Sequence, residues 1–352
     1  MNLEEIFAKR LKNARIMQGK SMEELAKAMQ NNYSKMAISK YEKGQLAPNS
    51  EALIAFAEAL NLPVDYFFRP FTVQIDSIKF RKLKSKLGSK LENSIKENIN
   101  DMIERYMDIE EICNATTLFE KPFADKISSP EQVKEAARVL REQWQIGNAG
   151  IVKVIDLLEE HGIKVLEIKA EPSFGGLSSK VNNQYPIIVL NKTFAAERKR
   201  FTALHELGHI ILPFDDSVSE KDEEALCHLF ASEMLILETV FKNILGPKRH
   251  DISYQELRAI QEQYGISCDA LMYKAKECGI ISQKRYKTYC IQKNKYQVFK
   301  DRVETNLYQN ESSSRFSRLV YKALSNDLIT TSKAAALLHQ SVAQVREDLA
   351  LV

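Results

Sequence analysis

Apolar residues along the first 70 positions recur every three or four residues, which is the spacing of amphipathic helices. Ser21 and Glu24 match the capping-box pattern that opens a helix. Ser34 can cap the following helix, and Gly44 is suited to end it. We therefore expect a compact bundle of five short helices: residues 4–18, 21–29, 34 to about 43, a helix carrying Leu53 to Leu60, and a short helix after Pro63.

A longer helical pattern follows this bundle. Residues 71–78 alternate loosely between apolar and polar and can form a connecting strand. From Leu87 to about Ile112, apolar residues recur at helical spacing without a break. This segment is interpreted as a connector helix that packs on another helix or on a second chain.

The middle of the chain mixes strand and helix patterns. Two apolar runs, residues 163–168 and 185–190, predict strands. Gly175 and Gly176 lie between them and indicate a close approach of backbone. A small sheet with helices around it makes an α+β domain. The helices expected there cover residues 129–144, 151–160, 201–211, 220–235, 239–244, 254–264 and 267–278.

The C-terminal residues 315–352 are again helical in pattern. Phe316, Leu319 and Val320 lie on one face of a first helix, and Thr331 to Val345 resembles a helix-turn-helix pair. We expect this region to form a helical cap on the α+β domain rather than to act as a second helix-turn-helix module. The predicted fold class is mainly α with a small β-sheet, and the predicted domains are residues 1–70, 71–128, 129–282 and 283–352.

Composition narrows the class of protein. A length of 352 residues allows two or three domains, and 44% hydrophobic with 28% charged residues is typical of a soluble globular protein. No apolar run approaches the roughly 18 residues of a membrane span, and the acidic N-terminus is not a signal peptide. Five cysteines without a C-x-x-C pair favour reduced thiols and a cytoplasmic location.

The net charge of +3 identifies no partner, but its distribution is uneven. Residues 79–86 are basic without an acid, and residues 284–302 hold seven basic residues against Asp301 alone. Tyrosines interleave the second stretch, a composition suited to nucleic acid and also to a solvated hairpin. For the first stretch, phosphate contact and a solvated face are equally favoured.

Residues 205–209 read His-Glu-Leu-Gly-His, the H-E-x-x-H pattern of zinc peptidases. On a helix, the four-residue spacing places His205 and His209 on one face, one turn apart. Two imidazoles can then hold zinc while the intervening carboxylate of Glu206 acts as a general base. Gly208 costs helix propensity and is expected to serve close packing.

Catalytic zinc of this kind takes a third protein ligand. Glu223 and Glu224 open the next predicted helix, and an acidic pair at a helix start is often only a favourable dipole interaction. Because two histidines await a partner, we assign Glu224 as the ligand and keep Glu223 as the alternative. His228, four residues after Glu224, is expected to orient a ligand from outside the ligand set; its ligation of the metal stays a weaker alternative.

The stretch from Ile187 to Leu235 resembles the ImmA/IrrE family of zinc-dependent metallopeptidases. The matching segments are residues 187–191, 197–209 and 224–231. The resemblance implies a zincin-like (gluzincin) fold in which Gly175 to Ser179 can be an edge strand that pairs with extended substrate. It also implies the same roles for the site: zinc binding by His205, His209 and Glu224, and Glu206 as general base.

Residues 5–68 closely resemble the XRE-type, lambda-repressor-like DNA-binding domain. The segment from Ser39 to Gly44, followed by Pro48, carries the resemblance. It implies that Ile38 and Tyr41 are core residues and that the exposed side of the third helix faces the major groove of double-stranded DNA. Domains of this type usually act as dimers, so the connector helix is our candidate for a homodimer contact. The expected DNA-contact residues are Lys35, Met36, Ser39 and Lys40.

This order of domains is similar to that of bacterial regulators in which both families occur together. It predicts a cytoplasmic DNA-binding transcription regulator with a zinc endopeptidase that cleaves a repressor or antitoxin-like protein. The alternatives are a transcription factor whose zinc domain is a sensor or scaffold without turnover, and an antitoxin-like binding module. The general base Glu206 argues against a purely structural site, which needs none.

Overall fold

The computed structural model describes residues 2–30, 32–75, 88–308 and 311–350. The chain forms two compact units. The first holds residues 1–117, 180–184 and 314–352, and the second holds residues 118–179 and 185–313. The basic run at 79–86 and the last part of the expected connecting strand lie outside the described residues.

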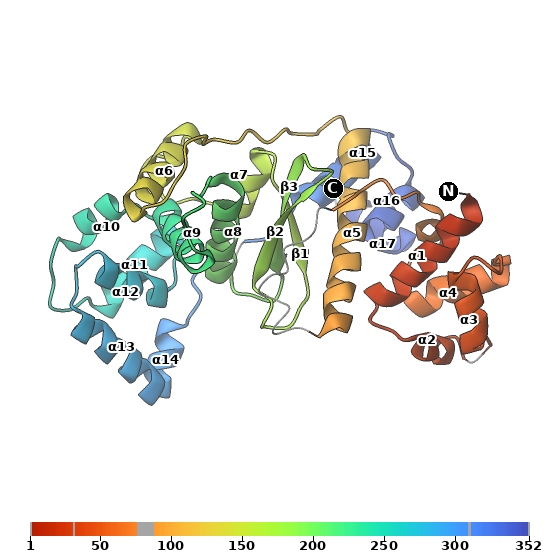
Figure 1. Cartoon of the computed structure of the whole chain (residues 1–352), viewed down its shortest axis with the longest axis horizontal. Helices are drawn as coiled ribbons and strands as arrows, with labels where there is room; N and C mark the ends of the chain where they lie inside the picture. Colours follow the sequence, from red (N-terminus) through yellow and green to blue (C-terminus); the bar gives the residue numbers. More distant parts are fainter. Residues whose placement is uncertain (1, 31, 76–87, 309–310, 351–352) are drawn as a thin grey trace. The chain divides into compact units, whose positions relative to one another are not determined.

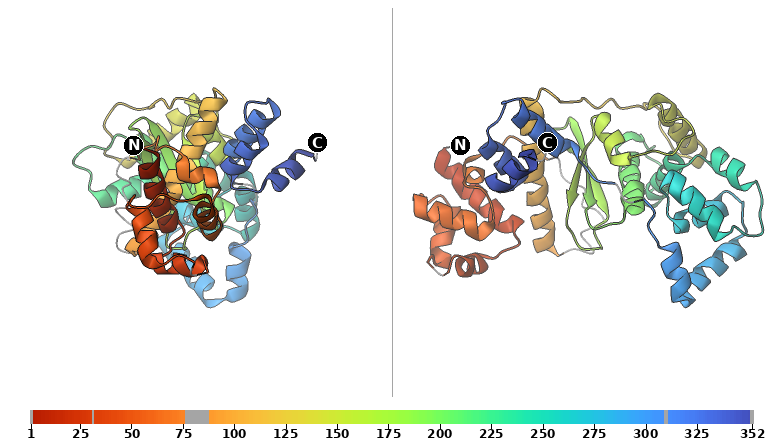
Figure 2. Two further views of the ribbon diagram at one scale, coloured as in Figure 1. Left: turned by 90° about the vertical axis from the view of Figure 1, so that its right-hand side faces the viewer. Right: turned by 180° about the vertical axis from the view of Figure 1, so that it is seen from behind.

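The first unit begins with the predicted helical bundle, drawn in red and orange in Figures 1 and 2. Phe7 centres its core, with ring centroids 6.3 Å from Tyr41, 6.2 Å from Phe56 and 5.9 Å from Phe67. The fifth element, the short helix expected after Pro63, is a 3₁₀ helix. The elements are α1 (Leu3–Met17), α2 (Met22–Ala28), α3 (Lys35–Glu42), α4 (Ser50–Leu60) and η1 (Val64–Phe68).

The helix ends form as the sequence predicts. The Glu24 amide donates to Ser21 Oγ at 3.1 Å, and the Ser21 amide donates to the Glu24 carboxylate at 2.6 Å, which completes the capping box. The Ser34 hydroxyl accepts from the Ala37 amide at 3.2 Å at the start of α3. Gly44 follows α3 with a φ of +68°, a conformation that glycine adopts without strain.

The connector helix α5 (Ser89–Ile112) packs within its own unit. Its buried apolar face, including Ile99 and Ile103, faces α1, and Ile109 joins the core of the C-terminal helices. The Arg10 guanidinium of α1 pairs with Glu104 at 2.7 Å. Of the two partners we expected for this face, the structure therefore shows another helix of the same chain, and a homodimer through α5 stays a prediction.

The C-terminal helices also belong to the first unit, and this corrects the expected cap on the α+β domain. Leu319 and Val320 pack with Ile109, because the apolar stripe predicted for residues 315–324 fits the last turns of α5. Arg315 pairs with Glu110 and anchors this contact. In the described part of the expected strand at 71–78, residues 71–75, one antiparallel bridge forms, between Ile75 and Val181. The helices are α15 (Arg315–Ser325), α16 (Thr331–Leu338) and α17 (Val342–Ala350).

A three-stranded sheet carries the second unit, with strands β1 (Lys164–Ile168), β2 (Gly176–Val181) and β3 (Tyr185–Asn191). The order is β1-β3-β2, so β2 is an edge strand as expected. Strands β1 and β3 run parallel, with Lys164 opposite Ile187. Every residue of β3 after Tyr185 is buried, which suits the central strand.

Helices of the second unit share one apolar core with Val165, Ile188 and Leu190 of this sheet. Helices α7 and α8 cover one of its faces (Figure 1). The basic residues 284–302 form two helices, α13 and α14, which complete this unit. Among the described helices, none has the length and apolar character needed to cross a bilayer. The helices are α6 (Pro130–Gln143), α7 (Val154–Glu160), α8 (Ala196–Ile211), α9 (Glu220–Leu235), α10 (Glu238–Leu245), α11 (Tyr254–Tyr264), α12 (Cys268–Glu277), α13 (Gln283–Lys295) and α14 (Gln297–Val303).

Candidate metal centre

Helices α8 and α9 cross closely at the H-E-x-x-H sequence. A Cβ atom added to Gly208 would lie 3.2 Å from Cys227 Sγ and 3.4 Å from the Phe230 ring, tighter than most such contacts. The close packing expected of Gly208 is therefore present. It brings the first turns of α9 over the histidine face of α8.

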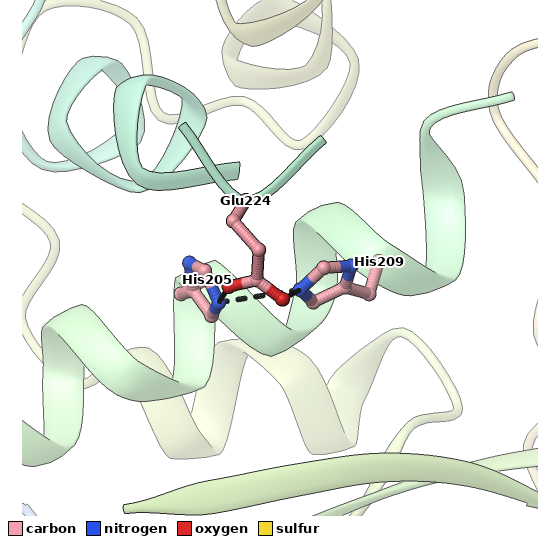
Figure 3. Close-up of side chains that lie close together, drawn as sticks. All are labelled: His205, His209 and Glu224. Atoms are coloured by element: carbon pink, nitrogen blue, oxygen red, sulfur yellow. Dashed lines mark hydrogen bonds and ion pairs between the residues drawn. The ribbon is translucent and has the colours of Figure 1, made fainter. Parts of the chain in front are cut away.

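Three side chains converge at this crossing (Figure 3). His205 and His209 rise from α8, and Glu224 reaches down from α9 between them. The two Nε2 atoms lie 3.2 Å apart. The Glu224 carboxylate places Oε2 3.3 Å from His205 Nε2 and Oε1 3.4 Å from His209 Nε2.

These separations fit a four-coordinate metal. Zinc bonds to imidazole nitrogen and carboxylate oxygen are about 2.0–2.2 Å, so a tetrahedral ion holds its ligand atoms about 3.3 Å from one another. The three separations here, 3.2, 3.3 and 3.4 Å, match that edge length. Two imidazoles with one carboxylate are a donor set of catalytic zinc. The residues present therefore fit a zinc ion.

Glu223, our alternative ligand, lies on the other side of His209. Its Oε1 is 3.0 Å from His209 Nδ1, the ring nitrogen that faces away from Glu224. A carboxylate in this position holds the ring and keeps the proton on Nδ1, which leaves Nε2 free for a metal. Glu223 thus orients the His209 ring from outside the ligand set, a role that we had expected only of His228.

The electrostatics around His209 favour a positive charge. Burial alone disfavours the charged imidazole, but the Cys227 sulfur and the Glu224 carboxylate outweigh it and raise the pKa of His209 to about 11. Burial raises the pKa of the Cys227 thiol, which lies 3.5 Å from His209 Nδ1. This thiol is a buried neighbour of the site and not one of its converging donors.

His228 packs against the site through its ring. Its centroid is 4.3 Å from that of His205 and 5.7 Å from that of Phe201. His205 Nδ1 is buried and has no hydrogen-bond partner among the described residues. Stacking on His228 therefore helps to fix the plane of the His205 ring.

Glu206 stands outside the converging donor set. Its Oε2 accepts a hydrogen bond of 2.8 Å from the hydroxyl of Ser178 on edge strand β2. We had placed Gly175 to Ser179 beside the metal but had not singled out Ser178. Strand alternation was the available signal, because Leu177 and Val181 face the core and Ser178 faces the other way.

The expected DNA-contact residues lie on α3. Lys35, Met36 and Lys40 are exposed, and Met36 has 73% of its surface free. Ser39 is half-buried. Ile38 and Tyr41 point into the bundle core, which leaves the opposite side of α3 open.

The fold and this site define the class: a helix-turn-helix DNA-binding domain joined to a domain of metallopeptidase type, the composition of a transcription regulator. Residues 11–67 match the family described as "Helix-turn-helix", and residues 158–276 match the peptidase family described as "IrrE N-terminal-like domain". Both resemblances found in the sequence are therefore confirmed.

A curated relative supports the second match. The chain is 26% identical over 128 residues to the "Radiation response metalloprotease IrrE" of Deinococcus radiodurans. The similarity covers 33% of this chain and 38% of the relative, so the two proteins share one domain and not their whole length.

Proposed function

We propose that this protein is a DNA-binding transcription regulator with a zinc-dependent endopeptidase that cleaves a repressor or antitoxin-like protein. The convergence of His205, His209 and Glu224, with Glu206 left outside the donor set, is the observation that carries the proposal. The metalloprotease named among the relatives supports the reaction class.

His205, His209 and Glu224 would hold the zinc ion. When bound, zinc supplies a Lewis acid that lowers the pKa of water and polarises a carbonyl group. Glu206 takes the proton of the attacking water as the oxygen adds to the scissile peptide carbon. It then passes this proton to the leaving amine nitrogen, and the carbon–nitrogen bond breaks. After one turnover, Glu206 is again an unprotonated carboxylate, as it was at the start.

Ser178 holds Glu206 for this role. Its hydroxyl donates to Oε2, which orients the carboxylate and leaves Oε1 for the proton. The same strand, β2, is the edge of the sheet and can pair with an extended peptide. Substrate backbone aligned along β2 would pass beside Glu206.

The N-terminal domain would direct the protein to its DNA site. Lys35, Met36, Ser39 and Lys40 on α3 would contact the major groove and its phosphates, in the way that recognition helices do. The proposal includes a cytoplasmic location, where duplex DNA and reduced thiols are both found; all five cysteines are free.

Glu206→Gln tests the proposal. The change keeps the size of the side chain and removes the base, so general acid–base catalysis of roughly 10²–10⁴-fold is lost. Cells carrying the variant should fail to raise the regulated transcripts, while the purified variant keeps its zinc and its DNA binding. An unchanged transcriptional response in these cells would support the sensor or scaffold alternative instead.

A further inference from the structure

Helix α13 (Gln283–Lys295) has one basic face that is neutralised by the rest of its unit. Arg285 pairs with Asp251 at 2.7 Å, and Lys293 pairs with Asp269 and with Glu304. Residues 285, 289 and 293 follow one another at four-residue spacing, so this face is the inner side of the helix, where Tyr289 is buried.

The outer side of α13 carries a second set, which we call the α13 lysine face. Spacings of three, one, three and four residues keep its members within about 100° of the helix circumference and spread them over about 16 Å of its axis. All are exposed, and the one apolar member, Ile291, shows 54% of its surface. The face consists of Lys284, Lys287, Thr288, Ile291 and Lys295.

Among the described residues, the three lysines of this face have no acidic partner. No Asp or Glu occurs from residue 282 to residue 300. Within the described part of the chain, the acids near α13 bind Arg285 and Lys293 on the inner side.

Ordinary solvated faces of the same unit are built differently. On α6, Arg138 lies between Glu135 and Glu142, and on α11, Arg258 pairs with Glu262. There each exposed cation has an acid three or four residues away, which stabilises the helix. In the sequence, no acid lies three or four residues from any lysine of the α13 lysine face. The like charges at positions 284, 287 and 295 therefore repel one another without compensation within the helix. A polyanion along the helix would relieve this repulsion.

We propose that the α13 lysine face binds the phosphate backbone of duplex DNA without reading its sequence. Lysine is a point charge that contacts phosphates, whereas the planar guanidinium of arginine is the usual reader of guanine. The face has no arginine. An acidic protein is the weaker partner, because protein interfaces need an apolar or aromatic centre and Ile291 is the one apolar residue here. The second unit would thus hold DNA by itself, in addition to the contacts of α3.

The salt dependence of binding tests this surface. The full-length protein and its Lys284→Gln/Lys287→Gln/Lys295→Gln variant are titrated onto a short duplex of random sequence over a range of salt concentrations. The slope of log K against log salt is negative, and each lost phosphate contact reduces its magnitude by about 0.9. The loss of three contacts therefore reduces the magnitude by about 2.7. Between about 50 and 200 mM salt, the variant should lose about 40-fold less affinity than the wild type.

A charge-matched control separates this surface from net charge. Lys192→Gln/Lys221→Gln/Lys248→Gln removes three exposed lysines scattered over the same unit, and its slope should stay within one phosphate contact of the wild-type slope. Equal slopes for the α13 variant and the wild type would overturn the proposal. So would an α13 variant that keeps its DNA slope but loses binding to poly-glutamate, because that result identifies an acidic protein as the partner.

Discussion

His205 and His209 meet Glu224 because one helical turn separates the histidines and Gly208 lets α9 approach them. The three donors alone do not fix the site. His209 is held from behind by Glu223, and Glu206 is held by Ser178. His209 and Glu206 therefore each have a supporting group from another element, which would hold them in position for the proposed metal.

Replacing Glu223 tests the support of His209. Loss of a carboxylate that orients a metal-binding histidine typically costs 10–100-fold in metal affinity. We expect Glu223→Ala to weaken zinc binding by roughly that factor, as measured by competition with a chelator, and to keep about one zinc per chain at saturation.

Two further variants serve as the controls for this measurement, one expected to keep zinc and one expected to lose it. Glu220→Ala removes an exposed acid from the same first helical turn and should leave zinc affinity unchanged within about twofold. His205→Ala removes a ligand and should abolish stoichiometric zinc. If Glu223→Ala loses zinc as completely as His205→Ala while Glu224→Ala keeps it, then Glu223 is the ligand and our assignment is wrong.

The residues carrying the metal chemistry were predictable from local spacing. The i, i+4 histidines and the acids at the start of the next helix are local patterns. The Glu223–His209 and Ser178–Glu206 contacts were not, because they depend on how α9 and β2 cross α8, and the sequence does not contain those crossing angles. The roles of adjacent Glu223 and Glu224 differ only through this geometry.

The metal helix α8 is anchored at its other end by a buried ion pair. Arg200 and Glu311 are both fully buried, with Nη1 and Oε2 2.7 Å apart. Arg200 also donates to the carbonyl groups of Ile151 and Tyr264, and Glu311 accepts from the Ile155 amide. Because Arg200 lies five residues before His205, this cluster fixes the start of the helix that carries the site.

Glu311→Ala should destabilise the protein strongly. It leaves the Arg200 guanidinium buried without its counter-charge, which typically costs about 3–5 kcal/mol. The measurement is the urea midpoint of the transition reported by Trp144, which stacks on His161 in the same unit. Glu160→Ala, an exposed acid at the end of α7, should shift the midpoint little. A Glu311→Ala midpoint equal to that of Glu160→Ala would contradict the role given to this pair.

At the level of elements, the sequence predicted most helices and the strands β1 and β3, because their apolar periodicity and caps are local. It did not predict which surfaces they cover. The apolar stripe of α5 was consistent with a second chain, and the residues 315–324 that cover part of it lie more than 200 positions later. Likewise, the 3₁₀ turn at Val64–Phe68 differs from an α-helix by hydrogen bonds that periodicity over five residues does not separate.

The whole molecule joins a helix-turn-helix domain to a peptidase-family domain, and the proposed DNA binding is testable separately from the proposed peptide cleavage. Lys35→Ala/Lys40→Ala removes two exposed cations from the open side of α3. Binding to the DNA upstream of the protein's own gene should weaken. The magnitude of the slope of log K against log salt should fall by about 1.8, the value for two phosphate contacts. Fluorescence anisotropy over a salt series measures both.

The control is Lys12→Ala, an exposed lysine on α1. This variant should reduce the magnitude of the slope by less than the roughly 0.9 expected for one phosphate contact. If the α3 double variant binds the upstream DNA as the wild type does, α3 is not the recognition helix, and the N-terminal domain would be a protein-binding module.

The measurement that bears most directly on the central claim is a comparison of newly formed protein N-termini in cells. Cells producing the wild type and cells producing Glu206→Gln at equal abundance are brought to the condition that induces the regulated genes, and N-termini are identified by mass spectrometry. We predict at least one internal cleavage in a repressor or antitoxin-like protein that is present with the wild type and reduced roughly 10²-fold or more with Glu206→Gln. Identical sets of N-termini in the two cultures, with transcription induced in both, would contradict the claim that this protein acts by peptide-bond cleavage.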